Sequence, residues 1–341
     1  IALDFYTGVL MARDYAFSFG FPVVLDVLDT QAQKSVVDDL ISSYDFNFCD
    51  AIIGPFLPDN VTAVARFAEQ LEIPVFSALS RPEGTLPKNL VQTLPDQELM
   101  SSAMMEYIKR NVQDKKMLFL GDINSPGLNK LREIWPKVEV LLPREEGYIA
   151  PEDILSNLSD NQENWLVLES RDPVIISNVI GVLNGMEYYE QKKIERLNIK
   201  KTHAKQKTYS VRLFTTDKNE AFDFDDISSF HLSNLEFTFP APTKSITEEV
   251  ESQLFVQQYA DRYGFHPNKY AIRGFDLTLD IILRGAINSA SLIENLVIPE
   301  TTNYTESKFH YQFRPDGGFN NTAFFLLKYN QQMELEELTN D

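Results

Sequence analysis

The sequence predicts an α/β fold with two lobes, each built on a parallel sheet flanked by helices. Two apolar runs, 51–53 and 74–76, have the length of buried strands, and apolar side chains recur at helical spacing between them. A strand, a helix and a second strand in this order form a β-α-β unit, which joins parallel strands. The pattern starts again after Pro95-Asp96, so we expect a second lobe from about residue 96. A chain of 341 residues is long enough for two domains.

The elements of the first lobe follow from apolar runs before residue 96. We expect a helix at 5–17, a strand at 23–28, a helix at 36–41 and a strand at 90–93. The helix of the β-α-β unit is marked by five apolar residues, Val61, Val64, Ala65, Ala68 and Leu71. Asp59 and Asn60 stand just before it, where an N-cap is expected.

The second series of elements contains three more apolar strands. We expect strands at 117–120, 165–168 and 211–214 and helices at 98–110 and 174–183.

Prolines and glycines mark the rest of the chain. The run 235–242, "LEFTFPAP", alternates and then breaks at prolines, which predicts an edge strand or a crossover. Two helices, 248–263 and 270–288, follow it, and alternating runs around Asp316-Gly317-Gly318 predict a hairpin within 308–329.

Composition excludes several classes of function. The net charge of −19 argues against nucleic acid as a partner, because phosphate binding needs clustered positive charge. The single cysteine, Cys49, excludes an internal disulfide, and the four histidines lack ligand spacing, so we expect neither a metal site nor a cofactor. The stretch 188–207 is locally basic, and it is either a solvated insertion or a contact for an anionic surface.

No residue pattern indicates catalysis. An enzyme needs a nucleophile with a base, a pair of carboxylates with a shifted pKa, or a metal. The acidic pairs Glu145-Glu146 and Asp225-Asp226 are adjacent in sequence, and adjacent residues point to different faces of a strand or helix. We therefore expect a protein that is not an enzyme.

Candidate binding residues follow the ends of the predicted strands, where ligands collect in parallel sheets. Ser77, Ser80 and Asp59 belong to the first lobe, and hydroxyls there could donate to a ligand. Serine and aspartate also favour caps and turns, so a structural role is the alternative for each.

Three further candidates belong to the second lobe. Asp122 and Asp217 follow strands, with a turn as the alternative role. Arg171 either pairs at the surface with Asp172 or Glu169, or presents a bidentate fork to a carboxylate or phosphate.

Four stretches, taken in chain order, resemble the type I periplasmic binding protein family in its branched-chain amino-acid receptor branch. They are "DFYTGVLMA" (4–12), "AIIGPFLPDNVTAVARFAEQLEIPVFSALS" (51–80), "VQQYADRYGFHPNKYAIRGFDLTLDII" (256–282) and "FRPDGGFNNTAFFLLKY" (313–329). The resemblance covers nearly the whole chain. It implies two Rossmann-like lobes joined by three crossovers, which close on a ligand bound in the cleft between them.

The same resemblance implies where the chain changes lobe. One lobe is expected to contain residues 1–96 and 243–302, and the other residues 97–242 and 303–341. Family members have a central apolar strand before the first helix, which this sequence lacks, so we expect residues upstream of Ile1. Such a segment could carry a membrane anchor or a wall-binding module of the LysM type.

The resemblance also implies roles for individual residues. Ala78 and Ser80 match positions that supply a carbonyl and a hydroxyl to the ligand, and Asp217 matches an acidic residue that pairs with the ligand's ammonium group. The turn 56–60 departs from the family, because it has no hydroxyl and adds the charge of Asp59. We interpret Asp276, at an acidic family position, as structural.

Taken together, these features predict an exported solute-binding protein, periplasmic or extracellular, that captures a small polar ligand for uptake or sensing. The ligand is expected to be amino-acid-like, a peptide or a cell-wall fragment, and a membrane transporter is the expected partner. The alternative is a cell-envelope protein that binds an envelope enzyme and regulates peptidoglycan synthesis or remodelling.

Overall fold

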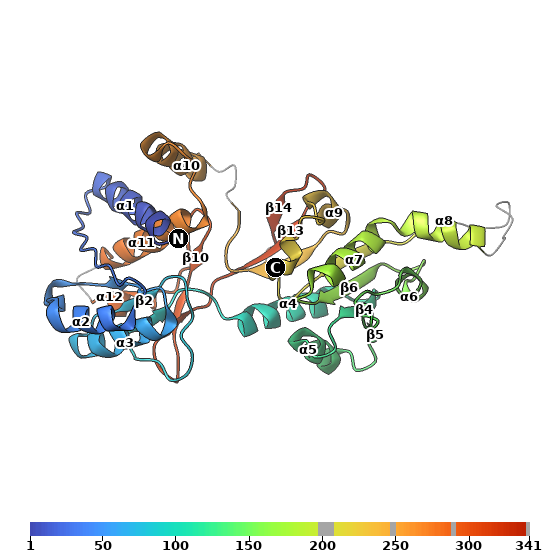
Figure 1. The fold of residues 1–341 in the computed structure, drawn as a ribbon, viewed down its shortest axis with the longest axis horizontal. Helices are drawn as coiled ribbons and strands as arrows, with labels where there is room; N and C mark the ends of the chain where they lie inside the picture. The colour runs from blue at the N-terminus through green and yellow to red at the C-terminus, as the bar shows by residue number, and fades with distance from the viewer. Residues whose placement is uncertain (197–207, 246–249, 288–290, 339–341) are drawn as a thin grey trace. The chain divides into compact units, whose positions relative to one another are not determined.

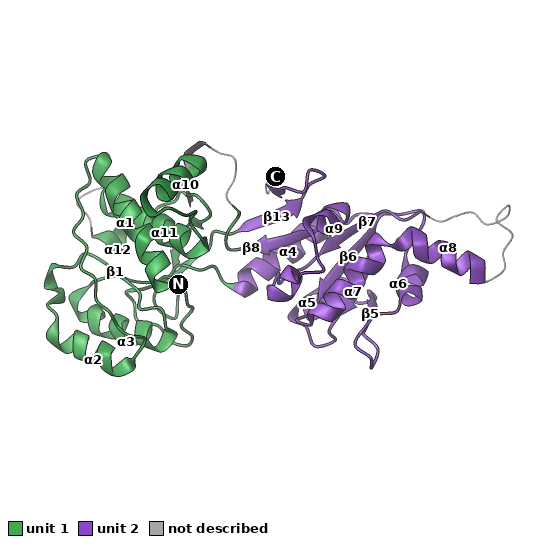
Figure 2. Cartoon of the chain, turned by 45° about the horizontal axis from the view of Figure 1, so that its top comes forward, with its two compact units in different colours: residues 1–96, 242–324 green, residues 97–241, 325–341 purple. Residues whose placement is uncertain are grey.

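The chain folds into two compact units in a computed structural model, which describes residues 1–196, 208–245, 250–287 and 291–338. Unit 1 contains residues 1–96 and 242–324, and unit 2 contains residues 97–241 and 325–341 (Figure 2). The chain therefore passes between the units three times. Each unit has a sheet covered by helices, which confirms the predicted two-lobed α/β fold (Figure 1).

Unit 1 is built on a five-stranded sheet. Its strands, in spatial order, are β1 (Ile52–Ile53), β2 (Val75–Ser77), β3 (Leu90–Gln92), β12 (Phe319–Asn321) and β11 (Tyr311–Phe313). The first four are parallel, with Ile52 opposite Val75, and β11 is antiparallel to β12. A separate pair joins β9 (Thr302–Asn303) to β10 (Lys308–Phe309).

Apolar faces of the helices bury this sheet. The helices of unit 1 are α1 (Ala2–Ser18), α2 (Lys34–Ser43), α3 (Pro58–Ala68), α10 (Val250–Tyr263), α11 (Lys269–Gly285) and α12 (Leu292–Asn295). Phe5 of α1 and Leu277 of α11 share one buried cluster with Phe76 of β2. The period of 3.6 residues places such side chains on one face of each helix.

Unit 2 is built on a seven-stranded sheet. Its strands, in spatial order, are β14 (Leu335–Glu337), β13 (Phe325–Tyr329), β8 (Thr238–Ala241), β7 (Val211–Phe214), β6 (Asn164–Glu169), β4 (Lys116–Gly121) and β5 (Glu139–Leu141). The strands from β8 to β5 are parallel, and β13 and β14 are added antiparallel. The helices are α4 (Gln97–Asn111), α5 (Pro126–Ile134), α6 (Pro151–Asn157), α7 (Pro173–Asn184), α8 (Met186–Arg196) and α9 (Ser229–Asn234).

The third passage between units differs from the predicted one. It lies between residues 324 and 325 and not between 302 and 303, and the second lies between 241 and 242. The hairpin of β11 and β12 belongs to unit 1, because Phe319 of β12 pairs with Val91 of β3. Only the next strand, β13, joins the sheet of unit 2, where Leu327 pairs with Phe239. The alternation of apolar and polar residues predicted the strands, but it does not indicate which sheet a strand joins.

Two predictions for the start of unit 1 are wrong. Residues 23–28 form no strand and pair with none of the described strands, and Val24 is 90% exposed. The helix after β1 begins at Pro58 with Leu57 as its N-cap, so Asp59 lies inside the first turn and Asn60 follows it. Proline is favoured at the first helical position, and it moves the start of the helix ahead of the two expected caps.

Strand β8, which contains Pro240, is not an edge strand. It lies between β7 and β13, and it ends where the chain leaves unit 2. Its pairing with β7 is confined to Phe214 and Thr238, whereas Pro240 pairs only with Leu326 of β13. A proline is tolerated there because β7 has already ended on its other side.

Candidate functional site

In unit 1 the end of β2 and the loop that follows it hold three of the predicted site residues. The Ser77 hydroxyl is buried and donates to the Ser80 carbonyl at 2.5 Å, so it stabilises the loop itself. Ala78 is also buried, and its carbonyl accepts a hydrogen bond from Arg273 Nε at 3.2 Å. Ser80 is partly exposed, and its hydroxyl lies 3.2 Å from that of Ser77. Of the three, Ser80 is therefore the residue whose side chain can reach a ligand.

The turn before α3 holds the fourth predicted residue of unit 1. Asp59 is exposed in the first turn of α3, and the structure does not bring it into hydrogen-bond contact with Ser77 or Ser80. The neighbouring Phe56 packs edge to face on Phe5, with ring centroids 5.1 Å apart. This turn therefore presents an apolar wall and one carboxylate.

In unit 2 the carboxyl ends of β4, β6 and β7 bring polar groups together. These three strands are neighbours, and the loops that follow them begin at Asp122, Ser170 and Thr215. Glu169, the last residue of β6, is 5% exposed, and its Oε1 accepts from the Thr216 N–H at 2.8 Å and the Thr216 hydroxyl at 2.6 Å. The Asp122 N–H donates to the Glu169 carbonyl at 2.8 Å.

The Glu169 carboxylate packs against Gly127, which has no side chain. A Cβ on Gly127, in the first turn of α5, would lie 2.4 Å from Glu169 Cδ, which no side chain can tolerate without a shift. The start of a helix also favours a nearby negative charge. The carboxylate therefore occupies a site formed by the beginning of α5 and the loop after β7.

Arg171 and Asp217 form an ion pair at the same edge of the sheet. Arg171 Nη2 lies 3.1 Å from Asp217 Oδ2, and the side chains are 82% and 30% exposed. Of the two predicted roles of Arg171, the surface pair with Asp172 or Glu169 is wrong, because Asp172 caps α7 and Glu169 is buried; the fork to a carboxylate or phosphate stays a prediction. Such an exposed pair contributes little to stability, so either partner can exchange it for a ligand.

The charge at this edge of unit 2 is negative. Burial raises the pKa of Glu169, the two Thr216 hydrogen bonds oppose that rise, and the charges of Asp217 and Asp122 add to it. Glu169 thus lies close enough to Asp217 and Asp122 to interact with their charges, and Arg171 pairs with Asp217. Neighbouring carboxyl groups of this kind favour a cationic group over an anionic one.

Glu169, Thr216 and Arg273 contribute to these loops but were not among the predicted site residues. Glu169 ends an otherwise apolar run, and Thr216 follows an apolar strand, so the rule that ligands collect at strand ends could have found both. Arg273 lies inside helix α11, and its contact with Ala78 spans 195 residues of sequence. No local pattern predicts such a contact.

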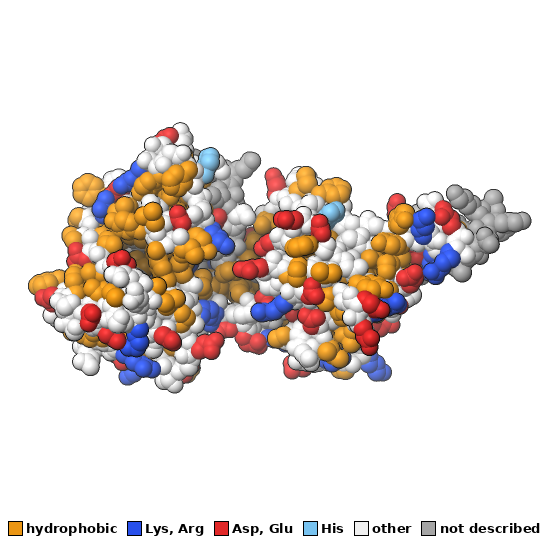
Figure 3. Space-filling model, viewed as in Figure 1, with side chains coloured by type: hydrophobic (Ala, Val, Ile, Leu, Met, Phe, Trp, Pro, Cys, Tyr) orange, Lys and Arg blue, Asp and Glu red, His pale blue; other side chains and the backbone are white. Residues whose placement is uncertain are grey.

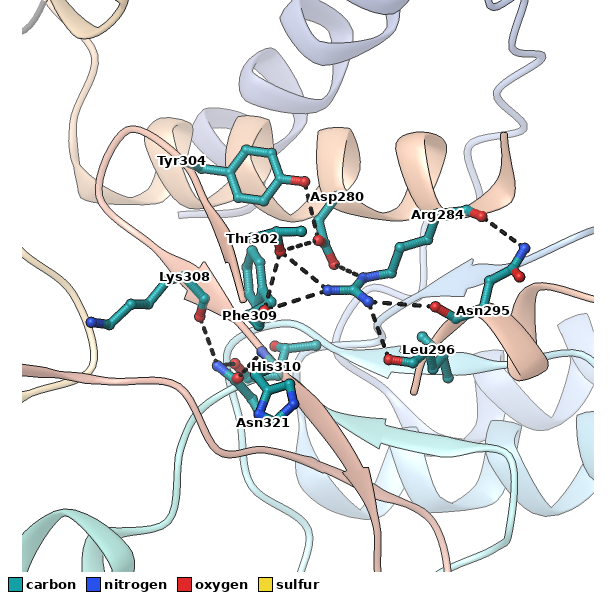
Figure 4. A network of polar contacts seen from close by, with 11 residues as sticks. Asp280, Arg284, Asn295, Leu296, Thr302, Tyr304, Lys308, Phe309, His310 and Asn321 are labelled. Atoms are coloured by element: carbon teal, nitrogen blue, oxygen red, sulfur yellow. Dashed lines mark hydrogen bonds and ion pairs between the residues drawn. The ribbon is translucent and has the colours of Figure 1, made fainter. Parts of the chain in front are cut away.

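Buried charges in unit 1 form a structural network away from these loops (Figure 4). Asp280 and Arg284 form an ion pair at 2.9 Å, with side chains 0% and 1% exposed, and Arg284 Nη1 donates to the Leu296 carbonyl at 3.1 Å. Asp276 accepts hydrogen bonds from the N–H groups of 305–307, which agrees with its interpretation as structural.

Surface charge is dispersed. Acidic side chains are scattered among basic and apolar ones on the face that Figure 3 shows. In the basic stretch, Lys192 and Lys193 of α8 lie within 4 Å of Glu195 and Glu190, and residues 197–207 lie outside the described part of the chain. Within the described residues, no cluster of His, Cys, Asp and Glu could hold a metal ion. None of the described helices is long and apolar enough to cross a membrane.

Comparison with known proteins gives one sequence match and many structural ones. Residues 11–111 match the model of a family described as "Receptor family ligand binding region". A search of curated proteins gave no significant match. A putative branched-chain amino acid ABC transporter protein from Rhodospirillum rubrum has a similar structure, with a TM-score of 0.63 and 11% identity over 99% of this chain and 95% of that chain.

Two further structures resemble the chain over its whole length. One is a branched-chain amino acid ABC transporter periplasmic ligand-binding protein from Burkholderia xenovorans, with a TM-score of 0.58 and 12% identity over 99% of this chain and 90% of that chain. The other is an ABC transporter substrate-binding protein from Desulfitobacterium hafniense in complex with Leu, with a TM-score of 0.53 and 13% identity over 98% and 95%. The chain has the fold of the type I periplasmic binding proteins, as its sequence motifs predicted.

Proposed function

We propose that the protein is a solute-binding protein that captures a small polar ligand with loops from both units. The observation that carries this proposal is the set of polar groups at the carboxyl ends of β4, β6 and β7, where the buried Glu169 lies near the charges of Asp217 and Asp122, and Arg171 pairs with Asp217. Parallel sheets bind ligands at this edge. The ligand is an amino-acid-like or peptide-like compound whose cationic group pairs with Asp217.

The ligand is not held as the family's amino acids are. The turn 56–60 has no hydroxyl to donate to a carboxylate, and Asp59 adds a negative charge there. Ser80 remains as a hydroxyl that can contact the ligand from unit 1. We therefore expect a ligand with a stronger cationic than anionic character.

The mechanism is a shift in population. A ligand that contacts loops of both units favours the conformation in which both sets of contacts form, by the free energy of the additional contacts. The similar structures carry the descriptions "substrate-binding" and "periplasmic ligand-binding", which supports an exported protein that works with a membrane transporter. No observation favours a role in peptidoglycan synthesis, so we do not propose one. We expect no catalytic activity.

A thermal-shift screen tests the proposal. The purified protein is heated with amino acids, polyamines, short peptides, sugars, nucleotides and muropeptides, and unfolding is followed by tryptophan fluorescence. Both tryptophans, Trp135 and Trp165, belong to unit 2, so the signal reports the unit with the acidic loops. A ligand at a hundred times its Kd stabilises the protein by roughly 2.7 kcal/mol.

Matched variants locate the site. We expect Asp217→Asn to weaken binding of a cationic compound at least tenfold and Ser80→Ala to weaken it about threefold, the range of one charged and one neutral hydrogen bond. Glu133→Gln removes the same charge from an exposed position of α5 and should leave binding unchanged. Stabilisation by no compound, or equal losses in Asp217→Asn and Glu133→Gln, would contradict the proposal.

A further inference from the structure

Arg273 is a buried cation in the middle of unit 1. It is 6% exposed, and its guanidinium lies 5.2 Å from the centre of the Phe309 ring. Burial lowers its pKa, while the charges of Tyr311, Asp276 and Asp280 act in the opposite direction. Among the described residues, no carboxylate lies within salt-bridge distance of it. A buried charge without an ion pair is costly, so its hydrogen bonds must compensate.

The guanidinium donates to three separate segments of the chain. Nε donates to the Ala78 carbonyl at 3.2 Å, Nη1 to the Ser307 hydroxyl at 3.3 Å and Nη2 to the Thr93 hydroxyl at 2.5 Å. The Thr93 hydroxyl in turn donates to the Ser77 carbonyl at 2.6 Å. One arginine thus holds two consecutive carbonyls of the loop after β2, one directly and one through Thr93.

These contacts lead to two of the connections to unit 2 through Thr93 and Ser307, and to the third through Asn321, which is bonded to Thr93. Thr93 precedes the first passage, between 96 and 97, by a few residues. Ser307 forms a β-bridge with Thr243, which directly follows the second passage. Asn321 Nδ2 donates to the Thr93 carbonyl at 3.1 Å and to the Ala323 carbonyl at 3.3 Å, just before the third passage at 324 and 325.

We propose that Arg273 is a positioning residue that ties the ligand-contact loop 77–80 to the unit 1 ends of all three connections. A planar guanidinium with five donors in a fixed fork can hold three acceptors from different segments at once, which a lysine cannot do. These hydrogen bonds hold the Ala78 carbonyl in a fixed position relative to the three connections. A ligand that contacts the loop is therefore held at a fixed distance from the connections. That residues 77–80 contact a ligand rests on the proposed function. That Arg273 links them to the connections rests only on its hydrogen bonds.

The test measures the distance between the units by spin labels in the full chain. Labels are attached at Lys34→Cys in α2 and Arg110→Cys in α4, which are 69% and 62% exposed, after the single cysteine is removed by Cys49→Ser. The variants are Arg273→Met, Arg273→Lys and Thr93→Val. The control is Asn89→Ala, because the buried Asn89 amide donates to the Ile73 carbonyl within unit 1, away from the connections.

We expect Arg273→Met to widen the distribution of distances at least 1.5-fold relative to the unsubstituted labelled protein. Thr93→Val should widen it less, Arg273→Lys should restore part of the original width, and Asn89→Ala should leave it unchanged. If Arg273→Met does not fold, the distance distribution of Thr93→Val tests the inference in its place. An unchanged width in both Arg273→Met and Thr93→Val, or equal widening in Asn89→Ala, overturns the inference.

A ligand titration separates the two proposals. If a compound of the thermal-shift panel binds, Arg273→Met should weaken its binding at least fivefold, and an unchanged Kd overturns the positioning role. If no compound binds, the proposed function fails, and the distance distributions still decide whether Arg273 ties the connections together.

Discussion

The buried pair of Asp280 and Arg284 should be strongly coupled in energy (Figure 4). Both side chains are almost fully buried, and the two residues are one helical turn apart on α11. Arg284 Nε lies 2.9 Å from Asp280 Oδ2. Arg284→Met leaves the Asp280 carboxylate with the Thr302 hydroxyl at 2.8 Å and the Tyr304 hydroxyl at 3.1 Å as donors, but without its counter-charge. Breaking such a pair costs about 3–5 kcal/mol, because a charge stays buried and uncompensated.

The double variant Asp280→Leu, Arg284→Met should lose less free energy of unfolding than the sum of the losses in the two single variants. Asp280→Leu leaves the guanidinium unpaired, with a similar cost of about 3–5 kcal/mol, so additive effects would reach about 6–10 kcal/mol. With both charges removed, the remaining cost comes from carbonyls that lose the arginine, such as that of Leu296, and we expect about 2–4 kcal/mol for these groups. The coupling free energy of the pair is therefore about 2–8 kcal/mol.

Urea unfolding followed by far-UV circular dichroism measures this coupling. Tryptophan fluorescence separates the units, because Trp135 and Trp165 both report unit 2. Lys34 and Asp38 provide the control, since this pair has the same spacing at 2.7 Å but is 69% and 51% exposed. We expect a coupling of about 0.3–0.5 kcal/mol for the control. Additivity within about 0.5 kcal/mol for Asp280 and Arg284 would refute the reasoning.

Two other predictions concern packing and pH. Gly127→Ala should lower the free energy of unfolding of unit 2 by about 1–3 kcal/mol in tryptophan-monitored unfolding, because the added Cβ meets the Glu169 carboxylate, whereas Gly181→Ala in α7 has open space and should not destabilise; equal effects contradict this. Burial, and then the charge of Asp276, raises the pKa of Glu306 to about 7, and burial raises that of Asp276 to about 6. Because the folded state holds these protons more tightly than the unfolded state, the contribution of both groups to the free energy of unfolding of unit 1 should fall as pH rises from about 4 to about 7. Glu306→Gln should reduce this slope between pH 5 and pH 7.5, and an unchanged slope counts against the assignment.

The sequence predicted most of the fold because the signals are local. Buried parallel strands are apolar runs, and their helices repeat at 3.6 residues, so the positions of β2, β4, β6 and β7 follow directly from the pattern. The hairpin at 311–321 was also predicted, but its sheet was not. Pairing of β12 with β3 joins residues more than 220 positions apart, and no local pattern contains that information.

The candidate site was predicted less well, because it depends on contacts between loops. Ser77, Asp122 and Asp217 were predicted from their places at the ends of strands, yet the Ser77 hydroxyl is bonded to the nearby Ser80 carbonyl. The sequence left Glu169 as one of two possible surface partners of Arg171, with a fork to a carboxylate or phosphate as the alternative role of the arginine. The burial of Glu169 follows from the space at Gly127 and the two donors of Thr216, which lie in other segments.

Amide hydrogen exchange with and without the strongest ligand of the panel tests the central claim most directly. The account predicts slower exchange in peptides that cover 78–82 in unit 1 and 121–125, 170–173 and 215–219 in unit 2 when the ligand is added. Asp217→Asn, at the same ligand concentration, should lose most of this protection. Protection confined to one unit, or found only in other segments such as α6 and α8, would contradict a ligand held by the loops of both units.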